Sequence, residues 1–88
     1  MNNVTFKKQG WDDYIYWQSQ DKKTLKRIND IIKDISRNGN DGIGKAERLS
    51  GNLSEYWSRR IDSKNRLVYR IVSEEIEIIQ CKNHYEDK

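Results

Sequence analysis

Cysteine, histidine and proline are nearly absent from this 88-residue chain, which contains one cysteine, one histidine and no proline. A single cysteine excludes an internal disulfide, and Cys81 in an apolar run is predicted to be a small buried residue. One histidine, His84, and one cysteine are too few to form a Cys/His cluster that suggests a metal site. The sequence therefore predicts a protein that works without a metal or another cofactor.

Long apolar segments are also missing, since hydrophobic residues make up 34% of the chain and charged residues 35%. No run approaches the roughly 20 apolar residues of a membrane-spanning helix, and the first residues lack the apolar core of a secretion signal. Because no linker or repeat divides it, we expect residues 1–88 to form one cytoplasmic domain with no membrane contact. The apolar content is low for a stable core, and a dimer would add buried surface.

Positive charge is concentrated in two stretches, residues 22–37 and 45–70, although the formal net charge is only +3. Such stretches favour a polyanionic partner, for which RNA is the candidate. Basic helix faces are also common in proteins that never bind nucleic acid, so a solvated surface is the alternative interpretation.

Residues 56–85 carry most of the strand signal. Three apolar and aromatic runs are separated by residues 62–65 and 73–75, which predicts an antiparallel meander of three strands. Side chains alternate between the two faces of a strand. The middle strand therefore has a core set of Leu67, Tyr69 and Ile71, and an opposite set of Arg66, Val68 and Arg70.

The register of this meander follows from the expected turn lengths. A three-residue turn over residues 73–75 pairs Val72 with Ile76. The same register predicts three further pairs, which are Leu67 with Cys81, Tyr69 with Ile79, and Arg66 with Lys82.

Three polar side chains then converge on the face away from the core. His84 lies diagonal to Arg66 in the predicted register. On the preceding strand, Trp57 and Ile61 match the apolar face, which leaves Arg60 on the face of Arg66. A slip of one residue in the turn at 62–65 would put Arg59 in the place of Arg60.

The N-terminal half predicts a short strand and two helices. Residues 4–6 alternate as a strand that pairs with the meander and ends at Gly10, and residues 11–19 have the spacing of a helix with Asp12 and Asp13 in its first turn. Asp21 is the predicted N-cap of a second helix, which ends at Gly39. The apolar face of that second helix consists of Leu25, Ile28, Ile31, Ile32 and Ile35.

The connection after the second helix, residues 38–44, is rich in glycine and asparagine and predicts a mobile loop. It is not a P-loop, because Gly44 and Lys45 are followed by Ala46 in place of serine or threonine. Residues 46–49 are expected to form a brief strand that brings Glu47 towards the sheet.

A carboxylate, two guanidinium groups and an imidazole on one face match the needs of RNA cleavage through the 2′-hydroxyl. Glu47 is the candidate base, Arg60 and Arg66 would stabilise charge at phosphorus, and His84 is the candidate acid. Isolated glutamates, strand arginines and terminal histidines more often have no such role, so a set of ordinary surface residues is the alternative.

Several runs of this chain strongly resemble the YoeB toxins of the RelE/ParE superfamily. They are Trp-Asp-Asp-Tyr-Ile-Tyr-Trp-Gln at 11–18, Gly-Lys-Ala-Glu at 44–47, Asn-Leu-Ser-Glu-Tyr-Trp-Ser-Arg-Arg-Ile at 52–61, Arg-Leu-Val-Tyr at 66–69 and His-Tyr at 84–85. The resemblance implies an α+β fold with two N-terminal helices on one face of a small antiparallel sheet. It also implies the toxin of a type II toxin–antitoxin system, an endoribonuclease that cleaves messenger RNA in the A site of the ribosome and so inhibits translation.

By the same resemblance, Glu47 matches the family's general base, and Arg60 and Arg66 match its phosphate-binding arginines. His84 and Tyr85 match its terminal acid and aromatic residue. Relatives tend to have Pro-Glu-Pro-Leu-Lys where this chain has Ala-Glu-Arg-Leu-Ser at 46–50, so Arg48 is expected to replace the missing lysine. Without the two prolines, the segment that carries Glu47 has more conformational freedom.

The resemblance implies partners as well. They are the ribosome with its messenger RNA, a YefM-type antitoxin, a second copy of the chain in a homodimer, and operator DNA that is reached only through the antitoxin. Two other functions remain open. One is a ParE-like inhibitor of DNA gyrase, which has no need of the pair Glu47 and His84, and the other is an RNA-binding module without catalytic activity.

Overall fold

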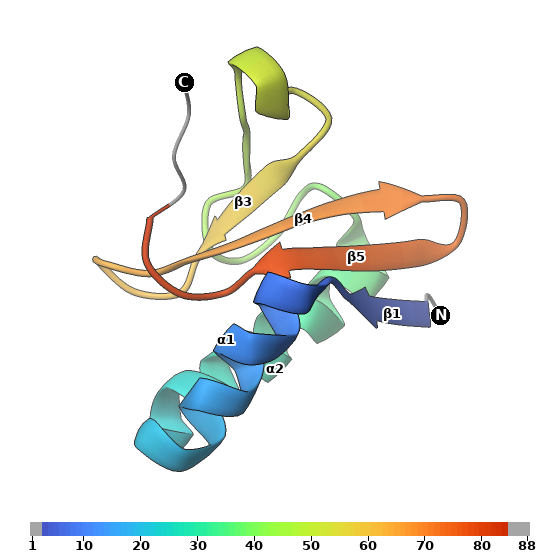
Figure 1. Cartoon of the computed structure of the whole chain (residues 1–88). Helices are drawn as coiled ribbons and strands as arrows, with labels where there is room; N and C mark the ends of the chain where they lie inside the picture. The colour runs from blue at the N-terminus through green and yellow to red at the C-terminus, as the bar shows by residue number, and fades with distance from the viewer. Residues whose placement is uncertain (1–2, 85–88) are drawn as a thin grey trace.

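The computed structural model describes residues 3–84, which form two α-helices, a short 3-10 helix and five strands. In chain order the elements are β1 (Asn3–Phe6), α1 (Lys8–Gln20), α2 (Lys22–Asn38), β2 (Glu47–Arg48), the 3-10 helix η1 (Gly51–Leu53), β3 (Trp57–Arg60), β4 (Arg66–Val72) and β5 (Glu75–Gln80). Both α-helices lie on one side of the sheet, and the segment that carries η1 rises on the other side (Figure 1). The predicted α+β architecture is confirmed.

The sheet has the strand order β1-β5-β4-β3-β2. The predicted meander is present as β3, β4 and β5, and β2 extends it with a further antiparallel pairing. β1 also joins the sheet, as expected, but it runs parallel to β5. The sheet is therefore mixed, and the prediction of a wholly antiparallel sheet is wrong at this edge. A parallel pair needs a long crossover, and residues 7–74 supply it.

The turn between β4 and β5 is one residue shorter than predicted. Val72 lies opposite Glu75 and not opposite Ile76. Ser73, the first residue of the turn, has a φ of 57°, which is the left-handed conformation that two-residue hairpin turns require. A serine followed by two glutamates carries no glycine or asparagine to indicate such a turn.

A bulge in the same strand pair then corrects the register. Tyr69 lies opposite Ile78 instead of the predicted Ile79, and the pairing shifts between Tyr69 and Val68. Beyond the shift Val68 lies opposite Gln80, which is the alignment that the predicted register gives. The extra residue in the bulge thus offsets the one-residue register difference that the shorter turn introduces.

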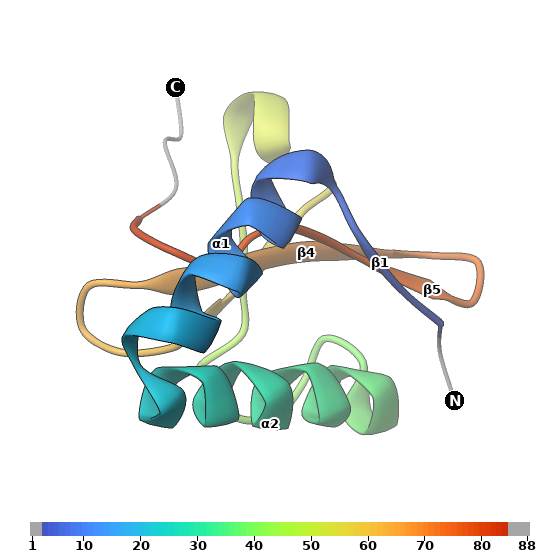
Figure 2. The same cartoon turned by 60° about the horizontal axis from the view of Figure 1, so that its bottom comes forward.

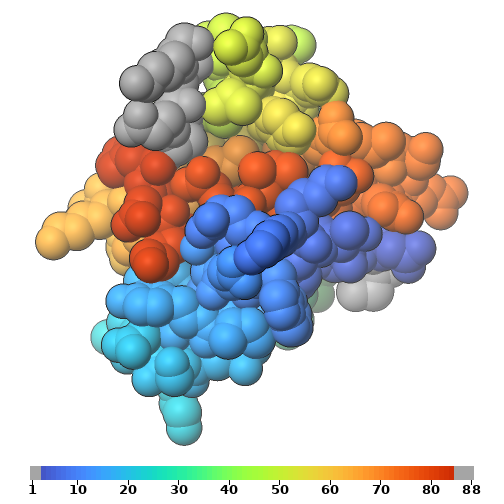
Figure 3. Space-filling view, viewed as in Figure 1, coloured from blue at the N-terminus to red at the C-terminus, as the bar shows by residue number. Residues whose placement is uncertain are grey.

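Helix α1 begins at Lys8, earlier than the predicted residue 11, and includes Gly10. Gly10 is buried, and a Cβ atom at this position would clash with the carbonyl oxygen of Ile78 in β5. The absence of a side chain therefore lets the helix lie directly against the strand, as the space-filling view shows (Figure 3). The glycine, taken from the sequence as the end of the strand, serves helix–sheet packing instead.

Two side chains of α1 hold the end of β5. Asp13 is 3% exposed, and its carboxylate accepts a hydrogen bond from the backbone N–H of Cys81 at 3.0 Å. The indole N–H of Trp17 donates to the carbonyl oxygen of Cys81 at 2.8 Å. Cys81 is fully buried, as predicted, and this burial, with a smaller contribution from Asp13, raises the pKa of its thiol to about 12.

Helix α2 follows the sequence closely. The Asp21 side chain accepts hydrogen bonds from the backbone N–H groups of Lys23 and Thr24, and Gly39 ends the helix with a φ of 63°. Three isoleucines of α2 enter the core, and in Figure 2 α2 lies below the sheet and below α1. The buried core consists of Trp17, Ile28, Ile31, Ile35, Ile61, Leu67, Tyr69, Ile76, Ile78 and Cys81.

Candidate functional site

The face of the sheet that the helices leave uncovered, called the open face below, is defined by the strand register. Glu47 of β2 lies opposite Ser58 of β3. Ser58 in turn lies opposite Val68 of β4. Opposed residues point to the same side of a sheet, and this row alternates with the one that contains core residue Tyr69. Ser58 and Val68 are 1% and 2% exposed, whereas Glu47, at the edge of this row, is exposed.

Arg60 and Arg66 lie directly opposite each other on the open face. The prediction that Arg60 shares a face with Arg66 is confirmed, and the slip that would have exchanged Arg60 for Arg59 does not occur. The Arg66 guanidinium donates to the backbone carbonyls of Asp62 at 2.7 Å and Asn65 at 3.1 Å. Within residues 3–84 neither Arg60 nor Arg66 forms an ion pair with a carboxylate. Two adjacent cations that no carboxylate of residues 3–84 contacts in an ion pair favour an anionic ligand.

His84 is the last described residue, and its backbone lies beside the start of β4. The carbonyl oxygen of the preceding residue, Asn83, accepts a hydrogen bond from the backbone N–H of Arg66 at 3.0 Å. The side-chain amide of Gln80 donates to the carbonyl oxygen of His84 at 3.3 Å. The backbone next to His84 is therefore hydrogen-bonded to β4 at Arg66. Tyr85, the fifth residue implied by the resemblance, lies outside the described residues.

Arg48 differs from the other candidate residues, because it points to the opposite side of β2 from Glu47. It lies opposite Trp57, which lies opposite Tyr69 of the core face. Its Nε atom donates to the carbonyl oxygen of Ser54 at 2.8 Å. The structure thus holds Arg48 at the edge of the sheet near η1 and does not bring it together with Glu47.

The sheet spacing sets the size of the candidate site. With strands about 4.8 Å apart and about 3.4 Å per residue, the backbones of Glu47 and Arg66 are separated by about 12 Å. That distance leaves room for a substrate group between the carboxylate and the guanidinium groups. An exposed carboxylate can accept a proton, an imidazole can donate one, and the two arginines can stabilise negative charge.

The third arginine of the open face is neutralised by acidic partners. Arg70 forms ion pairs with Glu77 and Glu55, each at 2.6 Å, and its guanidinium lies 5.3 Å from the centre of the Tyr56 ring. The hydrogen bond from Arg70 lowers the pKa of Glu77, against an opposing effect of desolvation. Arg60 and Arg66 therefore remain as the open-face arginines without a carboxylate partner in the described part of the chain.

Arg59 has a role that the sequence did not suggest. Its side chain is fully buried under the sheet and forms an ion pair with Asp34 of α2 at 2.7 Å. It also donates to the carbonyl oxygens of Ile43 at 2.6 Å and Gly39 at 2.7 Å, and to the Tyr69 hydroxyl at 3.2 Å. The hydrogen bond from Arg59 lowers the pKa of Asp34. The available signal was alternation, which put Arg59 on the core face, where a charge requires a partner.

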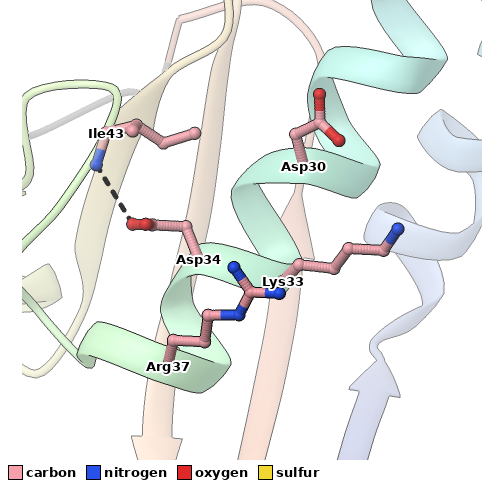
Figure 4. Close-up of a pocket in the computed structure, with 5 residues that line it drawn as sticks. All are labelled: Asp30, Lys33, Asp34, Arg37 and Ile43. Carbon is pink, nitrogen blue, oxygen red and sulfur yellow. Dashed lines mark hydrogen bonds between the residues drawn. The ribbon is translucent and has the colours of Figure 1, made fainter.

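This buried arginine organises the loop before β2. The Asp34 carboxylate that binds Arg59 also accepts the backbone N–H of Ile43 at 3.0 Å, as Figure 4 shows. The carbonyl oxygen of Gly44 accepts the backbone N–H of Arg60, so the loop is attached to β3 before it reaches Glu47. The surface above it holds a shallow pocket of about 380 Å³, lined by Asp30, Lys33, Asp34, Arg37 and Ile43 (Figure 4).

Residues 3–84 contain neither a membrane-spanning helix nor a metal-binding cluster. No helix in this range is long and apolar enough to cross a bilayer. No three histidine, cysteine, aspartate or glutamate side chains of the same range gather in a way that could hold a metal ion.

Comparison with known proteins gives consistent matches over nearly the whole chain. Toxin YoeB of Synechocystis sp. is 53% identical over 83 residues, which cover 94% of this chain and 96% of the relative. The YoeB–YefM complex from Staphylococcus aureus is similar in structure with a TM-score of 0.90 at 48% identity, covering 97% of this chain and 99% of the other. A YoeB dimer from the same organism has a TM-score of 0.90 at 49% identity, with coverages of 96% and 98%.

The family assignment follows from the sequence model that matches. The model described as the YoeB-like toxin of bacterial type II toxin–antitoxin systems aligns with residues 6–85. This range includes both helices, every strand from β2 to β5 and the candidate site. The chain therefore belongs to the YoeB-like toxin family of bacterial type II toxin–antitoxin systems.

Proposed function

We propose that this toxin is a ribosome-dependent endoribonuclease that cleaves messenger RNA in the A site and thereby inhibits translation. The observation that carries the proposal is the open face itself. Glu47, Arg60 and Arg66 share it by register, both arginines lack a carboxylate partner among residues 3–84, and the backbone of residue 83 is bonded to Arg66. A general base, two cations and a nearby imidazole fit the cleavage of a phosphodiester through its own ribose hydroxyl.

In the proposed reaction, the carboxylate of Glu47 removes the proton from the ribose 2′-hydroxyl. The 2′-oxygen then forms a bond to the adjacent phosphorus, and the bond from phosphorus to the 5′-oxygen of the next nucleotide breaks. Arg66 and Arg60 stabilise the negative charge that develops on the phosphoryl oxygens. His84 gives its proton to the departing oxygen, so the products are a 2′,3′-cyclic phosphate and a free 5′-hydroxyl. Each step uses side chains of this chain and requires no metal.

Tyr85 and Arg48 would contact the substrate outside the reacting atoms. An aromatic ring that stacks on a base contributes about 1–3 kcal/mol to binding, which is the role we assign to Tyr85. Arg48 lies at the edge of the sheet with its Nε bonded to the Ser54 carbonyl, where it can attract a phosphate that enters the site from beside β2.

The ribosome would supply the positioning that the open face lacks. Glu47, Arg60 and His84 are all exposed, so burial of these groups does not hold a flexible RNA strand in line for attack. Fixed orientation of the reacting groups can lower such a barrier by as much as about 7–11 kcal/mol. A message already held in the A site would satisfy this requirement.

The protein partners follow from the family. We infer a YefM-type antitoxin that binds and inhibits the toxin, because a relative of similar sequence was solved as a YoeB–YefM complex. A homodimer is inferred in the same way from the YoeB dimer of Staphylococcus aureus. Contact with operator DNA would occur only through the antitoxin.

The decisive experiment maps the 5′ ends of a message on translating ribosomes after addition of purified toxin. Glu47→Ala and His84→Ala should each lower the cleavage rate by about 10²–10⁴-fold, and Arg66→Ala by about 10²–10³-fold. Glu74→Ala serves as the matched acidic control, because this exposed turn residue lies at the far end of the sheet. It should cleave like the wild type.

The same experiment separates the alternatives. Growth arrest with intact messages, unchanged in a Glu47→Ala/His84→Ala double variant, would contradict the proposal and point to an inhibitor of DNA gyrase. Binding to ribosomes without any new 5′ end would point to a module that only docks. A gyrase supercoiling assay run beside the cleavage assay identifies the first of these outcomes directly.

A further inference from the structure

The turn between β3 and β4, residues 62–65, is bonded to both Arg66 and the segment that carries His84. Arg66 donates from its guanidinium to the Asp62 carbonyl at 2.7 Å, so the turn fixes this side chain. The side-chain carbonyl of Asn65 accepts the backbone N–H of Asn83 at 2.6 Å. Residue 83 immediately precedes His84 and has a φ of 65°, a left-handed conformation that is costly unless its surroundings fix it.

Asn65 can connect Asp62 with Asn83 because its side-chain amide has both a donor, Nδ2, and an acceptor, Oδ1. Its Nδ2 donates to the Asp62 carboxylate at 3.1 Å while its Oδ1 accepts from Asn83. The Asp62 carboxylate also accepts the backbone N–H groups of Lys64 at 2.8 Å and Asn65 at 2.7 Å. Burial raises the pKa of Asp62, but these hydrogen bonds outweigh it and the net pKa is lowered. The charged form therefore holds the amide in a single orientation.

The remaining contacts of the segment hold residues 81, 82 and 84, and leave residue 83 to be held by the turn and the start of β4. Asp13 and Trp17 hold the backbone of Cys81, and the side chain of Gln80 bonds to the carbonyl oxygens of residues 82 and 84. At residue 83 the bonds come from Asn65 and from the backbone N–H of Arg66. The two partners of residue 83 are therefore the last residue of the turn and the first residue of β4.

We propose that Asn65 is a positioning residue that couples Arg66 and His84, the charge stabiliser and the acid of the proposed reaction, through hydrogen bonds to Asp62 and Asn83. The inference rests on the proposed function, since it gives a reason why the two groups act at one phosphate. Asn65 touches no reacting atom. It fixes the backbone of residue 83, and thereby the starting direction of the His84 side chain.

The test combines a rescue with a spectroscopic signature. Asn65→Ala should lower single-turnover cleavage on ribosomes by about tenfold, the effect of roughly one lost hydrogen bond of 1–1.5 kcal/mol. Asn65→Asp should be at least as slow, because it sets a second carboxylate against Asp62. The double variant Asp62→Asn/Asn65→Asp exchanges donor and acceptor and keeps the connection to Asn83, so it should recover most of the rate. Ser63→Ala, in the same exposed turn, is the matched control and should cleave normally.

NMR of the free toxin checks the link without cleavage. Faster hydrogen exchange of the Asn83 amide and shifted His84 ring signals are expected in Asn65→Ala and Asn65→Asp, and restored values in the double variant. If the wild type cleaves and Asn65→Ala cleaves as fast, this inference alone is overturned. A wild type that cuts no message refutes the proposed function and this inference together. Unchanged NMR signals of residues 83 and 84 overturn the coupling whatever the cleavage result.

Discussion

Arg59 and Arg60 are neighbours in the sequence, but they lie on opposite faces of the sheet and differ in burial and in their partners. Arg59 is fully buried on the helix side, where Asp34, two backbone carbonyls and a tyrosine hydroxyl satisfy its guanidinium. Arg60 is exposed on the open face, and none of the carboxylates among residues 3–84 pairs with it. A buried charge must be paired within the protein, whereas an exposed charge is solvated by water and stays available to a ligand. Neighbouring positions on one strand therefore separate an arginine that is bonded within the protein from the one that we propose to bind phosphate.

The strongest test of this contrast is Arg59→Ala. Removing one partner of a buried ion pair costs about 3–5 kcal/mol, and the change also leaves the carbonyls of Gly39 and Ile43 without their donor. We expect the free energy of unfolding to fall by about that amount in urea titrations followed by tryptophan fluorescence. Equal stabilities for Arg59→Ala and the wild type would mean that the buried network does not hold the loop before β2.

A second test concerns how closely the helices pack against the covered face, which is the side of the sheet opposite the open face. Gly10→Ala introduces a Cβ that clashes with the Ile78 carbonyl oxygen and would lie 3.1 Å from the carbonyl carbon. Overpacking of this kind costs about 1–3 kcal/mol, because α1 must move away from β5. The same urea titration measures the loss. Gln18→Ala, at an exposed position of α1, should leave the stability unchanged, and a similar loss in both variants would contradict the assigned role of Gly10.

The open face was more predictable than the covered one. The residue set Glu47, Arg60, Arg66 and His84 follows from strand alternation and from the family motifs, because period-2 patterns and short turns determine which side chains share a face. The prediction that Arg60 and Arg66 share one face is confirmed. The roles of these residues in cleavage stay a prediction.

What the sequence could not give depends on contacts between distant segments. The left-handed Ser73, the bulge beside Val68 and the parallel pairing of β1 have no local residue signal. The partners of Arg59 come from α2 and from the loop after it, far away in the chain. Such contacts arise from packing, which single-sequence periodicity does not encode.

A third test uses acid to weaken the covered face selectively. The hydrogen bond from Arg59 is the main cause that lowers the pKa of Asp34 below 3.8. A carboxyl group with a lowered folded-state pKa stabilises the protein fully above its unfolded pKa, and this contribution is lost as the pH falls through the folded value. We expect the unfolding free energy of the wild type to drop below about pH 4, and Asp34→Asn to show a flatter profile there. Parallel profiles for both proteins would show that Asp34 does not carry this dependence.

The smallest effect on stability is expected for Arg60→Ala, and for that reason it sharpens the comparison most. Exposed side chains without a partner contribute within about 0.5 kcal/mol, so its urea midpoint should match that of the wild type, in contrast to Arg59→Ala. Cleavage of ribosome-bound messages should nevertheless fall, because one of the two cations opposite the scissile phosphate is lost. Arg60→Lys keeps the charge but not the two-pronged geometry and should recover only part of the rate. Full activity of Arg60→Ala would remove it from the site, whereas a large loss of stability would show that the open face also depends on this arginine for its fold.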